Sequence, residues 1–244
     1  MSRADDITTA FRSFREELDE HHDRREAIIK VSRDVTALSK KLIFHLHRTG
    51  QPGKAASILT EAQVKQTEIL KLLESIAPQL QDGNFWRYQR NITGGIQEFL
   101  EAVSFMHYLG PERSIITFAQ ASQLLQERSI RLTEADYLLG LADLTGELMR
   151  LGISSVGLSM HRNALAEAEL AVRALKNATE PLAAHVPHMY RKLSVTGQSL
   201  RKLEDARYTL ALRAKEYENA PDMMRELVRR MQEESVPHVE ELAA

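Results

Sequence analysis

The sequence contains no cysteine, little glycine or proline, and no long apolar run. Without cysteine the chain has neither disulfides nor thiolate-ligated metal sites, and thiol catalysis is excluded. Only 11 glycines and 7 prolines interrupt the 244 residues, so its secondary-structure elements should be long. No stretch of about 18 apolar residues exists, so we expect no membrane span and no membrane partner.

The chain also lacks a strong net charge, because its 32 Lys and Arg nearly balance its 34 Asp and Glu, which gives a formal net charge of -2. Overall charge therefore neither favours nor excludes nucleic acid, which would have to bind a local basic patch. The first residues are polar rather than apolar, unlike a secretory signal, and no clear nuclear localisation signal follows. We expect a cytoplasmic and, in some settings, nuclear protein.

What the sequence does contain is a high proportion of good helix formers, chiefly Leu, Ala, Glu, Arg and Gln. Apolar residues make up 43%, which argues against disorder, and no strand pattern competes with the helical spacing. This predicts an all-α fold, a single antiparallel bundle of about seven helices with a very long first helix. The expected helices cover residues 5–47, 54–77, 85–109, 118–128, 133–151, 156–176 and 187–216.

The predicted domain spans residues 1–218, and a charged C-terminal tail, partly helical or frayed, spans 219–244. The first helix of the domain has more than 40 residues without Gly or Pro and would be a rod about 60 Å long. Phe11, Phe14 and Leu18 begin its apolar stripe. So long a helix needs packing partners along its length, and the stripe predicts instability of the chain without a partner.

Two pairs of acidic residues interrupt otherwise apolar helices. Glu98 and Glu101 are three residues apart, and Asp143 and Glu147 are four apart, so each pair shares one helical face. Buried carboxylates are costly unless something neutralises them. A hard divalent cation with oxygen ligands, Mg²⁺ or in its place Mn²⁺, would do so. All four residues are therefore candidate metal ligands and catalytic groups for phosphoryl chemistry.

Other interpretations of these acidic pairs remain open. Glu and Asp at such spacing are common on solvated or salt-bridged helix faces, where they have a structural role. A di-iron carboxylate bundle with oxidoreductase activity is a further alternative, but neither pair is followed by the His of a Glu-x-x-His motif. The number of metal ions and the identity of a general base also stay open.

Basic residues precede the first acidic pair on the same predicted helix. Arg87 lies eleven residues before Glu98, and Arg90 eleven before Glu101, which is close to three turns or about 16 Å. Such a face could hold an RNA phosphate backbone, and neighbouring Trp86 and Tyr88 could stack on bases. The alternative is that both arginines are solvated and Trp86 is in the core. We interpret the remaining candidate histidines as structural or solvated: His21, His22, His45 and His47.

Several segments resemble the translin family, specifically its factor X branch. The resemblance begins with FRSFREELD at residues 11–19 and SKKLIFHLHR at 39–48, and includes EFLEAVSF at 98–105. It is strongest in DYLLGLADLTGELMRLGISSVG at 136–157, and it extends to about residue 213.

The resemblance implies more than the residues alone do. It implies a seven-helix fold and co-assembly with translin subunits in a closed, barrel-like hetero-octamer that holds RNA inside. It implies a Mg²⁺-dependent endoribonuclease that cuts single-stranded RNA, in passenger-strand removal from small RNAs and in processing of transfer RNA precursors. The family's acidic catalytic residues match Glu98, Glu101, Asp143 and Glu147, and its basic stretch falls near Arg87 and Arg90. The alternative is a non-catalytic RNA-binding or scaffold subunit.

Overall fold

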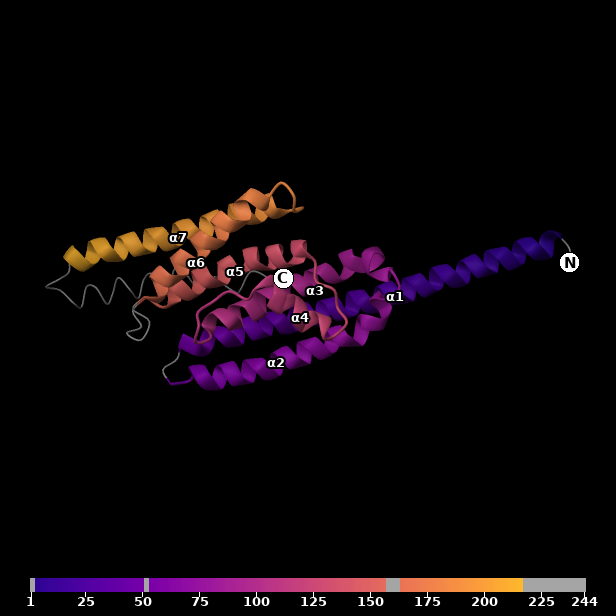
Figure 1. Ribbon diagram of the computed structural model, residues 1–244, viewed down its shortest axis with the longest axis horizontal. Coiled ribbons are helices and arrows are strands. Elements are labelled where there is room, and N and C mark those ends of the chain that lie inside the picture. Colours follow the sequence, from indigo (N-terminus) through magenta and orange to yellow (C-terminus); the bar gives the residue numbers. More distant parts are fainter. Residues whose placement is uncertain (1–2, 51–52, 157–162, 217–244) are drawn as a thin grey trace, which may run out of the picture.

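The computed structural model describes residues 3–50, 53–156 and 163–216, and within these ranges the fold is all-α (Figure 1). The prediction of about seven helices with a very long first one is confirmed. Short 3₁₀ turns follow α1, α2 and α6. The helices are α1 (Arg3–Leu46), α2 (Ala55–Ile76), α3 (Asn84–Leu109), α4 (Phe118–Gln126), α5 (Glu134–Ser154), α6 (Ala164–Thr179) and α7 (Met189–Glu216).

The helices pack in a series in which α5 has the central place. Helix α2 lies against α1, α1 against α3, and α3 against α5. Both α6 and α7 then pack on α5 and on each other, and Figure 1 shows them on the side of the bundle opposite α2. Helix α5 thus meets α3 on one side and the α6–α7 pair on another.

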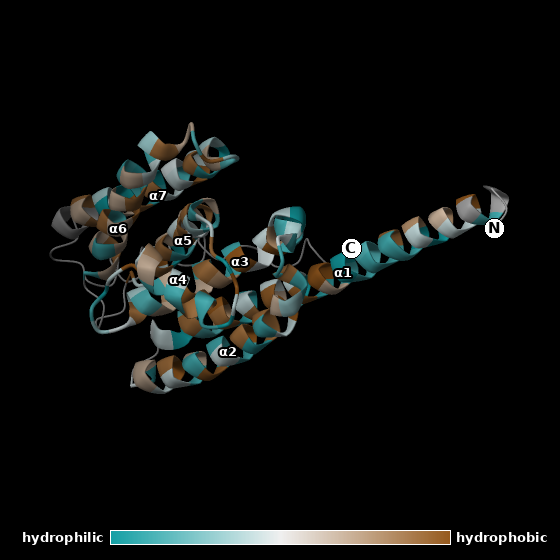
Figure 2. Cartoon of the chain, turned by 45° about the vertical axis from the view of Figure 1, so that its right-hand side comes forward, coloured by the Kyte–Doolittle hydropathy of each residue, from teal (hydrophilic) through white to brown (hydrophobic). Residues whose placement is uncertain are grey.

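The two halves of α1 differ in what they contact. In the C-terminal half, Ile28, Val35 and Leu42 recur at steps of seven and are fully buried in the core. The N-terminal part projects beyond the other helices (Figures 1 and 2). We call residues 5–20 of this projection the N-terminal arm. Its large apolar side chains are exposed: Ile7, Phe11, Phe14 and Leu18.

Two buried glycines allow α3 to approach its neighbours closely. A Cβ on Gly95 would lie 2.9 Å from the backbone oxygen of Ser32 in α1, and one on Gly140 of α5 would lie 2.9 Å from Cβ of Leu100 in α3. The missing side chain at Gly95 therefore permits the close approach of α3 to α1. A Cβ on Gly94 would meet nothing within 4 Å.

Several predicted helix limits were wrong. Helix α5 continues to Ser154 because Leu151 and Ile153 are buried in the core and packing extends it. Helix α6 begins at Ala164 rather than near residue 156.

Proline 187 does not occupy the first turn of α7. His188 follows it with a left-handed φ of 68°, so the helix starts only at Met189. The predicted tail at 219–244, and with it the domain boundary, lies outside the described residues. None of the described helices is long and apolar enough to cross a membrane.

Candidate functional site

Hydrogen bonds between α3 and α5 fix how these two helices face each other. Asp136, in the first turn of α5, is 2% exposed. Its carboxylate accepts hydrogen bonds from the side chains of Thr93 and Gln97 of α3, the latter at 3.0 Å. It also accepts one at 2.7 Å from Thr133, the N-cap residue, whose side chain accepts in turn from the Asp136 backbone N–H. This buried network orients α5 on α3, because a rotated helix would leave these polar groups unsatisfied.

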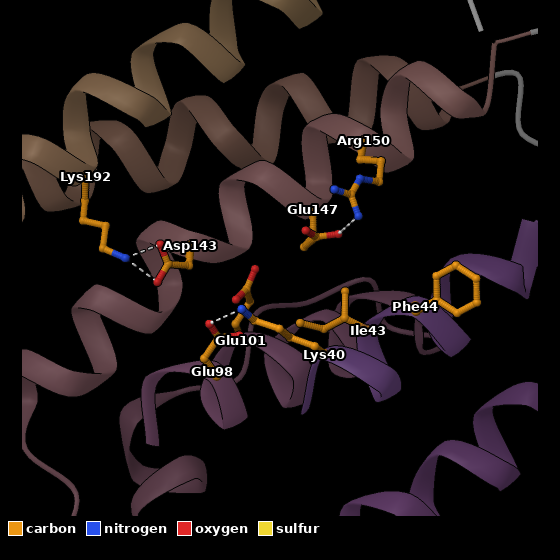
Figure 3. Close-up of a pocket in the computed structure, with 9 residues that line it drawn as sticks. All are labelled: Lys40, Ile43, Phe44, Glu98, Glu101, Asp143, Glu147, Arg150 and Lys192. Carbon is orange, nitrogen blue, oxygen red and sulfur yellow. Dashed lines mark hydrogen bonds and ion pairs between the residues drawn. The ribbon is translucent and has the colours of Figure 1, made fainter. Parts of the chain in front are cut away.

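The four predicted carboxylates come together in one cavity of about 460 Å³. Glu98 and Glu101 point from α3 towards Asp143 and Glu147 on α5 (Figure 3). The spatial convergence expected from the helical spacing is therefore present. Lys40, Ile43 and Phe44 of α1 line the same cavity, as do Arg150 of α5 and Lys192 of α7.

Three of the four carboxylates have cationic partners. Lys192 binds Asp143, and Lys40 Nζ lies 3.4 Å from Glu98 Oε1. Arg150 Nη1 donates to Glu147 Oε2 at 3.2 Å. The cavity is thus lined by four acidic and three basic side chains.

Glu101 is the exception. It is 8% exposed, and no ion pair or hydrogen bond from the described residues reaches its carboxyl group. Burial, and then the negative charges of Asp143, Glu147 and Glu98, raise the pKa of Glu101 to about 9. With a pKa this far above its usual value, Glu101 favours its protonated, neutral form at neutral pH.

Glu147 shows the opposite shift because it has a partner that the sequence did not reveal. Burial acts to raise the pKa of Glu147, but the hydrogen bond from His47 and the charges of Arg150 and His47 outweigh burial and lower it. His47 Nε2 lies 2.5 Å from Glu147 Oε2. His47 is therefore not solvated but held against Glu147 in the candidate site, a contact compatible with the structural role expected for it.

The carboxylate set suits a hard divalent cation in its chemistry and burial. Its donors are oxygens on facing helices, and Glu101 is buried with no ion pair among the described residues, so its carboxyl group is available as a ligand. In the present side-chain arrangement, no three His, Asp or Glu residues of the described chain are placed to hold one ion. To bind a cation, Asp143 would therefore have to release Lys192, and Glu98 would have to release Lys40.

The two predicted RNA-binding arginines lie on the first two turns of α3, away from the cavity. Both are exposed. Arg87 donates a hydrogen bond to a ring nitrogen of His21 in α1, whereas no side-chain partner of Arg90 is found among the described residues. Trp86 is 60% exposed and stacks under Arg131, with the guanidinium carbon 4.8 Å from the ring centroid. Tyr88 is buried, so it cannot stack on a base as the sequence suggested.

The side chains that contact the carboxylates were missed at the sequence level. Lys40, Lys192 and His47 come from α1, α7 and the turn after α1, far from the acidic pairs in sequence. Only Arg150, three residues after Glu147, carried a local signal, as an i,i+3 ion pair.

These features place the chain in the class of all-α bundle proteins that have a carboxylate cavity between facing helices. Cavities of this kind can hold a cation. The sequence profile of the translin family matches residues 23–214, and the chain belongs to this family. Translin-associated protein X from Pongo abelii is 35% identical over 234 residues, covering 86% of this chain and 80% of the relative. The homologue from Schizosaccharomyces pombe is 33% identical over 215 residues, covering 83% and 87%.

Solved structures share the fold. Crystal structures of apo-NeC3PO and of AfC3PO each align with a TM-score of 0.63, at 21% and 20% sequence identity. Each alignment covers 80% of this chain and 94% of the other. The predicted translin-family membership is confirmed.

Proposed function

We propose that this chain is the catalytic subunit of a translin-family complex that cuts single-stranded RNA with Mg²⁺, for which Mn²⁺ can substitute. The observation that carries the proposal is the convergence of Glu98, Glu101, Asp143 and Glu147 from two helices on one cavity. Glu101 is buried and the other three acids are half-buried, and acidic groups that face one another are costly for folding alone, so a functional site is a better explanation than chance.

The residues of the site have separate roles in this proposal. The four carboxylates would hold the cation, which supplies polarisation of a phosphate oxygen and a lowered pKa of an attacking water. Lys40, Lys192 and Arg150 would then be released from their carboxylate partners and could bind the non-bridging oxygens of an RNA phosphate. His47 keeps Glu147 oriented and ionised.

Partners follow from the same proposal. Translin subunits would complete a hetero-octamer that holds the RNA strand, and exposed Arg87 and Arg90 would contact its phosphates. The cellular substrates would be passenger strands of small RNAs and transfer RNA precursors. A second candidate function, a non-catalytic RNA-binding subunit, is favoured by the ion pairs that occupy three of the four carboxylates.

An RNA cleavage assay distinguishes the two. The chain is co-purified with a translin subunit and incubated with labelled single-stranded RNA, with Mg²⁺ or with chelator. We expect Mg²⁺-dependent products, and a loss of about a hundredfold or more in Asp143→Ala, because a ligand of the cation is removed. Glu134→Gln, an exposed acid on the same helix, is the matched control and should cut normally. Full activity of Asp143→Ala, or cleavage in chelator, would contradict the proposal.

Metal binding can be measured without activity. Saturating Mg²⁺ or Mn²⁺ should raise the melting temperature of the native chain, because a ligand at one hundred times its Kd stabilises by about 2.7 kcal/mol. Glu101→Gln should lose this shift and Glu134→Gln should keep it. A native chain that does not respond to either cation would favour the non-catalytic alternative.

A further inference from the structure

A second cavity, of about 570 Å³, adjoins the carboxylate cavity. Asp143 and Lys192 line both, so their ion pair is the common wall. The remaining lining comes from α3, α5 and the start of α7. No step of the proposed cleavage uses this second cavity.

The charge of the second cavity differs from that of the first. Asp143 is the one acidic residue among the described residues that line it, and it is already bound to Lys192. Arg191 and His188 are exposed there, and no side-chain hydrogen bond or ion pair to either is found in the described part of the chain. A guanidinium with unused donors at a cavity is suited to bind a phosphate.

The backbone at this cavity adds to the positive potential. Arg191 and Lys192 lie in the first turn of α7, a helix of 28 residues, and His188 directly precedes it, so the positive end of the helix dipole lies at the cavity. His188 has a left-handed φ of 68°, which is unfavourable for a residue with a Cβ. Such strain is concentrated at functional sites.

The rest of the lining of the second cavity suits a nucleobase. Leu139 and Ala142 of α5 and Val195 of α7, which is 52% exposed, provide apolar surface. Gln97 Nε2 donates to Thr93 Oγ1 and to Asp136, both at 3.0 Å, which fixes the orientation of the amide. Its carbonyl oxygen is left to accept a hydrogen bond from a base N–H.

We propose that this second cavity is a nucleotide subsite for the RNA strand. Arg191 and His188 bind the phosphate next to the one in the carboxylate cavity, and the base lies against Leu139, Ala142 and Val195. Lys192, on the common wall, binds either Asp143 or the strand. This inference rests on the proposed function, because it assigns the second cavity to the same RNA substrate.

RNA binding measured in chelator tests the subsite independently of cleavage. The full chain, with its translin partner, is titrated into a short fluorescent single-stranded oligoribonucleotide. Arg191→Ala should weaken binding roughly tenfold, as expected for one lost charge-assisted contact. The salt dependence should become shallower by about 0.7 in log K against log salt. Arg201→Ala, an exposed arginine on the same helix that lines neither cavity, is the matched control and should bind like the native chain.

Further outcomes separate the subsite from its alternatives. With cleavage blocked by chelator, RNA that carries 4-thiouridine should cross-link to residues between His188 and Val195. Equal binding by Arg191→Ala and the native chain, absence of RNA binding in chelator, or cross-links only elsewhere would overturn the subsite. A free nucleoside monophosphate that binds as tightly as the oligonucleotide would overturn its assignment to a strand. Failure of the proposed nuclease would show instead as RNA binding that depends on Arg191 without Mg²⁺-dependent products.

Discussion

Glu101 differs from its three acidic neighbours in forming no ion pair with the described residues, although the charge of Lys192 acts on it and lowers its pKa slightly against the larger effect of burial. Asp143, Glu98 and Glu147 each form an ion pair, and their charges act on a group that is already buried. The raised pKa of Glu101 is thus a property of the whole cavity rather than of one contact. It also makes the stability of the metal-free chain depend on pH.

The first prediction concerns this pH dependence. The pKa of Glu101 is about 9 in the folded chain and near 4.5 when unfolded, so between these values only the folded state holds the proton. The contribution of Glu101 to the free energy of unfolding is therefore complete below about pH 4.5. It decreases as the pH rises and is lost once the pH passes about 9. In chelator, urea unfolding should show Glu101→Gln gaining stability relative to the native chain from pH 5 to pH 9, by a few kcal/mol. A difference that stays constant over this range would contradict the assigned burial.

A second prediction concerns Asp136, which joins α3 to α5. Asp136→Ala would leave the side chains of Thr93, Gln97 and Thr133 without their acceptor in a buried place. We expect a loss of about 2 kcal/mol or more in the free energy of unfolding. Glu134→Ala, two residues earlier and exposed, should change it by less than about 0.5 kcal/mol. Similar losses in the two variants would show that the network does not stabilise the helix pair.

Residue chemistry was predictable where it depended on one helix. The spacings of Glu98 to Glu101 and of Asp143 to Glu147 were enough to predict that each pair shares a face. The partners Lys192 and His47 were not predictable, because they are brought to the site by tertiary packing of α7 and of the end of α1. No periodicity in one segment reports which distant segment will lie beside it.

At the scale of elements, apolar periodicity and the scarcity of Gly and Pro were enough to predict seven helices. The errors arose where local backbone or packing effects decide. At the start of α7, the left-handed conformation of His188 keeps Pro187 out of the helix. At the end of α5, burial of Leu151 and Ile153 extends the helix beyond its expected limit.

The adjacent glycines of α3 give a prediction about helix packing. Gly95→Ala would place a Cβ against the Ser32 backbone of α1, so we expect a loss of about 1–3 kcal/mol in the free energy of unfolding. Gly94→Ala meets open space and should stabilise by up to about 1 kcal/mol through helix propensity. Denaturant unfolding of both variants measures the difference. Shifts of the same sign and size would contradict the close contact between α1 and α3.

At the scale of the whole molecule, the N-terminal arm is the part that the bundle does not cover. Ile7, Phe11, Phe14 and Leu18 alternate at steps of four and three, the spacing of a helix that packs on another helix. Within the described residues, Phe11 and Phe14 have an aromatic contact with each other. Under the proposed co-assembly, this stripe is a surface for a translin subunit.

Substitution in the arm tests that role. The double variant Phe11→Ser and Phe14→Ser should keep the melting temperature of the isolated chain, because the arm contacts none of the core. It should reduce co-assembly with a translin subunit, measured as complex mass by analytical ultracentrifugation. Arg12→Ser, an exposed neighbour, should assemble normally. Unchanged complex mass in the double variant would exclude the arm from the interface.

The central place of α5 has a consequence for how this chain can vary. Asp143 and Glu147 face the carboxylate cavity while Leu139 and Ala142 face the adjoining one, and Gly140 fits closely against α3. One inserted residue after Gly140 would turn everything downstream by about 100°, and one deletion would turn it back by as much. Exposed positions of this helix can therefore change in identity. An insertion or deletion between Asp136 and Glu147, however, would turn the lining side chains away from both cavities.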